Sequence, residues 1–205
     1  MSLKELKNNF ERRFNICLKN TFGGQGNIKI GKNKVTIKKD ESIANIDFVY
    51  LNNLNAYGTI IVVKSPVIKL DLKAFNPPYK SNLANEDYIF CMSTMGVKDG
   101  CPLLPTTENG INKTCELLVD RLKEIHLPNI INLLELDKNL VEDVINNPKC
   151  YSYPFLIVML AMKKNNLSKI DVDRDKILNE KILGFNNDKD IKLKFNNDIF
   201  QEYSL

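Results

Sequence analysis

The side chains that most often transfer protons, bind metals or hold phosphate are scarce in this chain. It has one histidine, His126, and four arginines among 205 residues. His126 directly precedes Leu127 and Pro128 in a leucine-rich stretch, with no serine, cysteine or carboxylate suitably spaced to act with it. An imidazole at a helix end can instead cap free carbonyl groups, so we interpret His126 as structural. The sequence therefore predicts no catalytic residue, no cofactor, no metal site and no enzyme activity.

One pattern of carboxylates does fit metal-dependent chemistry. Asp47 belongs to one predicted strand, while Asp71 and Lys73 are two residues apart on another, and thus on the same strand face. Restriction-type nucleases hold Mg²⁺ with an Asp and a second carboxylate, and place a Lys two residues beyond it. Any alternating strand with a charged outer face produces the same spacing by chance. The pattern favours a solvated face and leaves a metal-dependent nuclease as the alternative hypothesis.

The cysteines indicate neither a disulfide framework nor a zinc site. There are five, an odd number, and they are scattered without a C-x-x-C pair. Cys115 falls on the apolar stripe of a predicted helix, where it is expected to fill the core.

Charge and hydropathy exclude several partners. The formal charge of +4 is spread along the chain, and its densest cluster lies on one predicted hairpin, at Lys29, Lys32, Lys34, Lys38 and Lys39. A solvated sheet face explains this cluster better than nucleic-acid binding, which relies on arginine. The longest uncharged apolar run, 155–162, is too short to cross a bilayer. The N-terminus mixes charges into its first turn and has no apolar core of the kind that a signal peptide needs. We expect a cytoplasmic protein that contacts neither membrane nor nucleic acid directly.

The N-terminal part predicts a helix followed by a sheet. Ser2 and Glu5 form a capping box, and Gly23-Gly24 ends the helix that follows. Alternating apolar residues then predict five strands of an antiparallel meander, half buried under that helix. These strands cover 27–31, 34–38, 46–51, 57–64 and 67–75.

Asn76-Pro77-Pro78 marks a change of architecture. Segment 85–95 is ambiguous between strand and helix, and 96–106 reads as a loop. Helical periodicity follows, with one or two edge strands expected in the tail at 191–203. The predicted helices cover 107–125, 129–135, 138–146, 153–164 and 173–183. The fold class is thus α+β, a single domain over 1–205 that is sheet-rich in 1–76 and helix-rich in 77–205.

Two sets of residues are candidates for binding a protein partner. Glu116, Asp120 and Glu124 are spaced four apart and would line one face of the 107–125 helix. Tyrosines at irregular surface positions are common anchors of protein interfaces. Those selected here are Tyr79, Tyr151 and Tyr153.

The chain resembles bacterial immunity proteins, in particular those paired with the toxins of contact-dependent growth inhibition. The resemblance rests on the helix running into Phe22-Gly23-Gly24, the hairpin from Ile28 to Ile37, and the Tyr151-Ser152-Tyr153-Pro154-Phe155 entry to an apolar helix. It implies a non-catalytic inhibitor that binds a cognate toxin domain, often a nuclease, stoichiometrically. Inhibitors of nucleases are usually acidic, whereas this chain is basic overall, so a local acidic patch is required. A secretion chaperone remains a further alternative, because the chain also opens with a helix and then a sheet.

Overall fold

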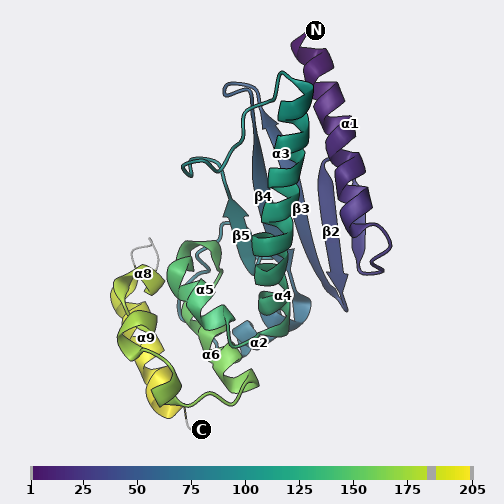
Figure 1. Ribbon diagram of the computed structural model, residues 1–205. Coiled ribbons are helices and arrows are strands. Elements are labelled where there is room, and N and C mark those ends of the chain that lie inside the picture. The colour runs from purple at the N-terminus through teal and green to yellow at the C-terminus, as the bar shows by residue number, and fades with distance from the viewer. Residues whose placement is uncertain (1, 184–187, 204–205) are drawn as a thin grey trace. The chain divides into compact units, whose positions relative to one another are not determined.

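The structure is a computed structural model, and it describes residues 2–183 and 188–203. A helix leads into a five-stranded antiparallel sheet, and helices predominate from residue 108 onward (Figure 1). The predicted α+β class is therefore confirmed. The elements in chain order are α1 (Leu3–Phe22), β1 (Ile28–Gly31), β2 (Lys34–Lys39), β3 (Ser42–Leu51), β4 (Ala56–Lys64), α2 (Pro66–Ala74), β5 (Phe90–Ser93), α3 (Glu108–Arg121), the π-helical turn η1 (Leu122–His126), α4 (Leu127–Glu135), α5 (Leu140–Asn146), the 3₁₀ turn η2 (Pro148–Cys150), α6 (Pro154–Lys164), the 3₁₀ turn η3 (Lys169–Asp171), α7 (Arg174–Ile177), α8 (Glu180–Leu183) and α9 (Lys189–Glu202).

The chain forms two compact units, each made of two separate stretches. The sheet unit comprises Met1–Val63 and Met92–Pro128, and the helical unit comprises Lys64–Cys91 and Asn129–Leu205. The prediction of one domain over residues 1–205 stays a prediction.

In the sheet unit, α1 begins and ends as its sequence predicts. The Ser2 hydroxyl accepts from the Glu5 amide at 3.3 Å, the Glu5 carboxylate accepts from the Ser2 amide at 2.6 Å, and Gly23 is the C-cap. The helix buries Phe10 and Phe14, whose rings contact Tyr57 of β4 and Phe48 of β3 respectively. This aromatic layer fixes α1 on the sheet.

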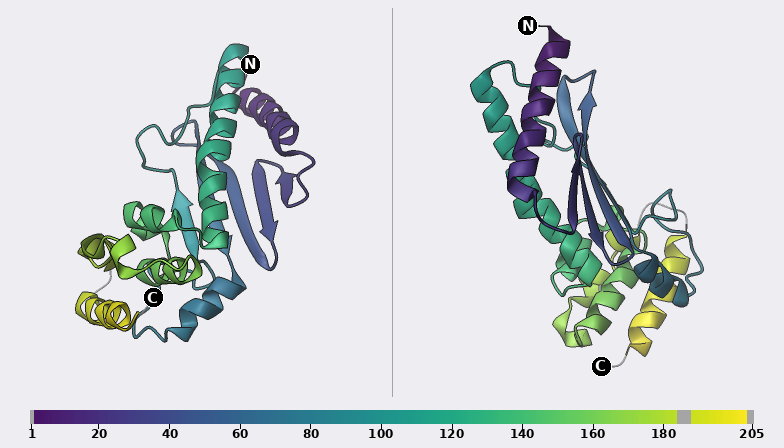
Figure 2. Two further views of the ribbon diagram at one scale, coloured as in Figure 1. Left: turned by 60° about the horizontal axis from the view of Figure 1, so that its bottom comes forward. Right: turned by 90° about the vertical axis from the view of Figure 1, so that its right-hand side faces the viewer.

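The sheet has the strand order β1-β2-β3-β4-β5. Pairing of Lys34 with Asp47 and of Ile37 with Ala44 sets the β2–β3 register, so Val35, Ile37, Ala44, Ile46 and Phe48 share the buried face. Within the sheet unit, α1 and α3 lie side by side on this face (Figure 2). Cys115 of α3 is buried there, as predicted.

The segment predicted as a fifth strand, 67–75, is instead the helix α2. Ser65 is its N-cap, accepting from the Ile68 amide at 3.3 Å, and Pro66 occupies the first turn, where its missing N–H costs nothing. Ile68 and Leu72, four residues apart, are buried, whereas Leu70 is 69% exposed. The fifth strand is β5, inside the segment that the sequence left ambiguous.

The helical unit has α6 at its core. Every residue from Pro154 to Met162 is buried, which explains why this helix is apolar on all sides. The predicted last helix, 173–183, is divided into α7 and α8, and Asp173 caps α7 by accepting from the amides of Asp175 and Lys176.

The tail is a helix, α9, where edge strands were predicted. Its buried side chains are Lys192, Asn196 and Phe200, spaced four apart. The Lys192 ammonium donates to Asn82 at 2.9 Å, and Asn196 accepts from the Tyr79 hydroxyl at 2.9 Å. Because two of its three buried positions are polar, the spacing of apolar residues does not indicate this helix.

Candidate protein-binding surface

Helix α3 offers one face to the core and the opposite face to solvent. The Thr107 hydroxyl accepts from the Gly110 amide at 3.1 Å and starts the helix. Ile111, Cys115 and Leu118 then point to the core at spacings of three and four. This arrangement directs the predicted acidic positions outward.

Glu116, Asp120 and Glu124 are all exposed, and the spacing of four aligns them along the outer face of α3 and η1. Among the described residues, none of the three carboxylates forms an ion pair or a hydrogen bond through its side chain. Leu117, adjacent to Glu116, is 40% exposed. The face also carries the exposed Lys113 and Lys123, so it combines carboxylates, an apolar side chain and scattered ammonium groups.

The π-helical turn η1 adds a second apolar group to this face. The Leu127 amide donates to the carbonyl of Leu122, five residues back, and Pro128 has no amide hydrogen to restore the usual pattern. The wider turn moves each following side chain around the axis. His126 is consequently buried, while the adjacent Ile125 is 52% exposed.

The loop that precedes α3 is bound to β4 at both ends. The Thr94 amide donates to the Thr59 carbonyl at 3.0 Å, and the Tyr57 amide donates to the Pro102 carbonyl at 2.9 Å. The loop also lies closely over Gly58 of β4, where a Cβ would come within 3.0 Å of the Met95 side chain. These bonds give a segment without regular structure a fixed path.

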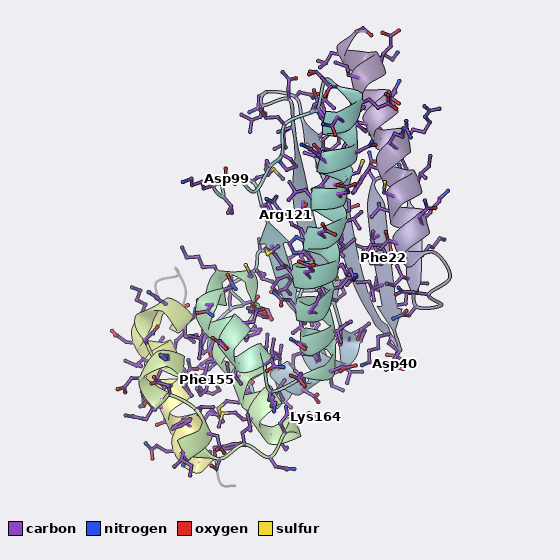
Figure 3. The ribbon with its side chains drawn as sticks, in the orientation of Figure 1. Phe22, Asp40, Asp99, Arg121, Phe155 and Lys164 are labelled. Carbon is purple, nitrogen blue, oxygen red and sulfur yellow. The ribbon has the colours of Figure 1, made fainter. Side chains whose placement is uncertain are left out.

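Arg121 of α3 holds the apex of this loop. One guanidinium nitrogen donates to the Asp99 carbonyl at 3.0 Å and the other to the Gly100 carbonyl at 3.5 Å, linking the two labelled residues Arg121 and Asp99 in Figure 3. The clamped apex presents Val97, which is 60% exposed. We call Val97 together with Glu116, Leu117, Asp120, Glu124 and Ile125 the α3 surface.

Of the predicted tyrosine anchors, Tyr151 belongs to the core of the helical unit. It is fully buried, its ring meets that of Phe90 edge-on at 4.9 Å, and its hydroxyl donates to the Asp143 carboxylate. Burial, followed by the nearby Asp143 charge, raises the pKa of Tyr151. A buried side chain offers no surface to a partner, and this corrects the prediction for Tyr151.

Tyr79 and Tyr153 are half-buried and lie together in the helical unit, with ring centroids 5.9 Å apart. The Lys192 ammonium lies 5.2 Å from the centroid of the Tyr79 ring. Burial raises the pKa of both hydroxyls. These contacts mainly tie α9 to residues 79–82 and to the start of α6, so a role of the two rings in partner binding stays a prediction.

The residues of the nuclease hypothesis do not have the geometry it requires. Asp47 lies on β3, with its carboxylate 3.4 Å from the Lys34 ammonium. Asp71 and Lys73 lie on α2, where side chains two residues apart do not face each other. Among the described residues, no group of three or more His, Cys, Asp or Glu side chains could hold a metal ion.

The one imidazole is also placed unfavourably for proton transfer. Burial, and secondarily the charge of Arg121, lowers the pKa of His126 to about 4. The buried ring is therefore neutral near pH 7.

Within the parts of the chain that the structure describes, no helix combines the length and apolar character needed to span a membrane. No protein-family model matches this chain, and no curated protein or solved structure shows significant similarity to it.

Proposed function

We propose that this protein is a non-catalytic inhibitor, an immunity protein that neutralises a cognate toxin domain by stoichiometric binding in the bacterial cytoplasm. The observation that carries the proposal is the α3 surface. It exposes two large aliphatic side chains of the helix and η1, together with three carboxylates that have no side-chain partner among the described residues. Exposed apolar groups beside charges are typical of surfaces that bind proteins.

The rigidity of the α3 surface also favours binding. Its carboxylates stand on a helix packed against the sheet, and Val97 stands on a loop held by Arg121. A surface that is already ordered loses less conformational entropy when a partner docks. Tight inhibition therefore requires less compensating interaction energy.

The charge of the α3 surface suits a basic partner. A toxin domain that acts on nucleic acid carries positive charge around its active site, and carboxylates facing that charge would steer and orient the complex. The exposed Lys113 and Lys123 on the same face offset two of the three carboxylate charges, which leaves a small local excess of negative charge. The more distant charges that contribute to the overall +4 are largely screened by salt beyond a Debye length of about 8–10 Å. The identification of the partner as a toxin rests on the resemblance to immunity proteins.

The alternatives have less support. The nuclease hypothesis depended on a strand that is a helix, and no specific contact favours a secretion chaperone. The inhibitor hypothesis also makes a prediction that neither alternative shares, namely that a stoichiometric partner is lost when the α3 carboxylates are reversed.

The test is a pull-down from the native bacterium with the tagged protein. The α3 variant combines three substitutions, Glu116→Lys, Asp120→Lys and Glu124→Lys. The matched control reverses three other exposed carboxylates, Glu41, Asp198 and Glu202, to Lys. The proposal predicts one near-stoichiometric toxin-like partner that the wild type and the control retain and the α3 variant loses. Equal retention by all three proteins, or no partner for any of them, contradicts it.

A further inference from the structure

The helical unit contains a large groove that the proposed function does not use. Its volume is about 1240 Å³, and it lies between α5 and η2 on one side and the segment from Leu167 to Lys181 on the other. This exceeds the roughly 300–1,000 Å³ typical of small-molecule pockets. An elongated ligand such as a peptide segment fits a groove of that size better than a compact metabolite does.

The groove has an aliphatic lining and a rim of ammonium groups. Val141, Ile145, Leu167 and Val172 contribute the half-buried aliphatic side chains. Five lysines surround them, all exposed. They are Lys138, Lys149, Lys176, Lys181 and Lys189.

Three acidic residues, Glu142, Asp171 and Asp173, also line the groove, and two of them are committed to local structure. Asp171 accepts from the amide and the hydroxyl of Ser168, both at 2.7 Å. Asp173 caps α7 and lies 3.3 Å from the Lys176 ammonium. By contrast, the ammonium groups of Lys138 and Lys181 have no hydrogen bond or ion pair with the described residues. The lining therefore has a net positive charge, and the charges of Lys138 and Lys181 are not neutralised by a nearby carboxylate among the described residues.

We propose that this groove binds an acidic peptide segment of a partner protein, with aliphatic side chains interspersed among its carboxylates. The lysines would face the carboxylates, and the lining would cover the aliphatic side chains. A single-stranded nucleic acid fits less well, because such ligands stack their bases on aromatic rings, and no aromatic residue is among the described residues that line the groove. The inference is independent of the proposed function, since the groove contains no residue of the α3 surface.

The test is fluorescence anisotropy with a fluorescein-labelled ten-residue peptide of glutamate and leucine, titrated with the full-length protein. We expect saturable 1:1 binding that weakens roughly tenfold when Lys138→Glu and Lys181→Glu are combined. The control combines Lys29→Glu and Lys38→Glu, exposed positions on β1 and β2, and should bind as the wild type does. Thermal unfolding of each variant establishes that all are folded.

Three outcomes overturn the inference. They are the absence of saturable binding, an equal loss in the control variant, and tighter binding of a ten-nucleotide thymidine oligomer than of the peptide. A peptide with alanine in place of leucine should bind more weakly, and equal affinity would show that the aliphatic lining plays no part. None of these results bears on the pull-down with the α3 variants, so either proposal can fail alone.

Discussion

Replacing Arg121 by Ala should loosen the loop apex without unfolding the protein. The side chain donates to two loop carbonyls, those of Asp99 and Gly100. A hydrogen bond from a charged group contributes about 1.5–3 kcal/mol when well shielded. Because Arg121 is only half-buried and one of the distances is 3.5 Å, we expect a combined loss of about 1.5–2 kcal/mol in the free energy of local opening.

Amide hydrogen exchange measures this loss directly. The Val97 amide donates to the Thr94 carbonyl at 3.2 Å and the Gly100 amide to the Val97 carbonyl at 3.0 Å, so both exchange when the loop opens. A loss of about 1.5–2 kcal/mol corresponds to exchange roughly 10–30-fold faster at these two amides. Amides of β2 and β3 should keep their protection.

The matched control is Arg12→Ala, because Arg12 forms one long hydrogen bond, 3.4 Å, to Asn9 within α1. Unchanged exchange at Val97 and Gly100 in the Arg121 variant, or an equal acceleration in the Arg12 variant, would refute the inference that Arg121 holds the loop apex in place.

Three further outcomes are expected. Tyr151→Phe removes the buried hydroxyl that donates to Asp143 and should lower the free energy of unfolding by about 1–2 kcal/mol in urea titrations, and an unchanged midpoint would contradict this. Ser65→Ala removes the cap of α2 and should lower the free energy of unfolding in urea titrations by about 1 kcal/mol. Ser65→Asp keeps an acceptor at the cap and should retain most of that free energy. The folded-state pKa of His126, about 4, lies below its ordinary value of 6.5, so the unfolded chain binds more protons between these values. The free energy of unfolding should therefore fall by roughly 3 kcal/mol as the pH drops from 6.5 toward 4. Urea titrations at pH 7 and 4.5 measure this fall, and it should be smaller in the His126→Gln variant.

The elements predicted correctly are those whose local signals agree with their burial. In α1 the capping box and the apolar spacing indicate the same helix, and in β2 the buried Val35 and Ile37 alternate with lysine and threonine as a one-sided sheet requires. For such segments the pattern of apolar residues describes the contacts that are actually made.

Two segments, 67–75 and 191–203, were predicted as strands but are helices, because the pattern of their apolar residues did not describe their burial. In α2, alternating Ile68, Leu70 and Leu72 suggested a strand, although the Ser65-Pro66 pair before them is a helix start. In α9 the buried positions include Lys192 and Asn196, whose partners are more than 100 residues away in sequence. Only the tertiary contacts reveal why those polar residues face inward.

The candidate site was predictable in part for the same reason. Four-residue spacing was enough to place Glu116, Asp120 and Glu124 on one exposed face. The exposure of Ile125 depends on the π-helical turn, and that of Val97 on the bonds from Arg121, and the spacing of apolar residues indicates neither of them. Conversely, Tyr151 was predicted to be a surface anchor, yet it packs on Phe90 in the core.

The most direct test of the proposed interface is the affinity of the captured partner domain for the purified protein, measured by isothermal titration calorimetry. We expect 1:1 binding that weakens about a hundredfold or more when Glu116, Asp120 and Glu124 are all changed to Lys, since reversed charges then face a basic surface. The triple control at Glu41, Asp198 and Glu202 should bind as the wild type does. Equal affinity of the α3 variant and the control for the partner would show that the α3 surface is not the binding site.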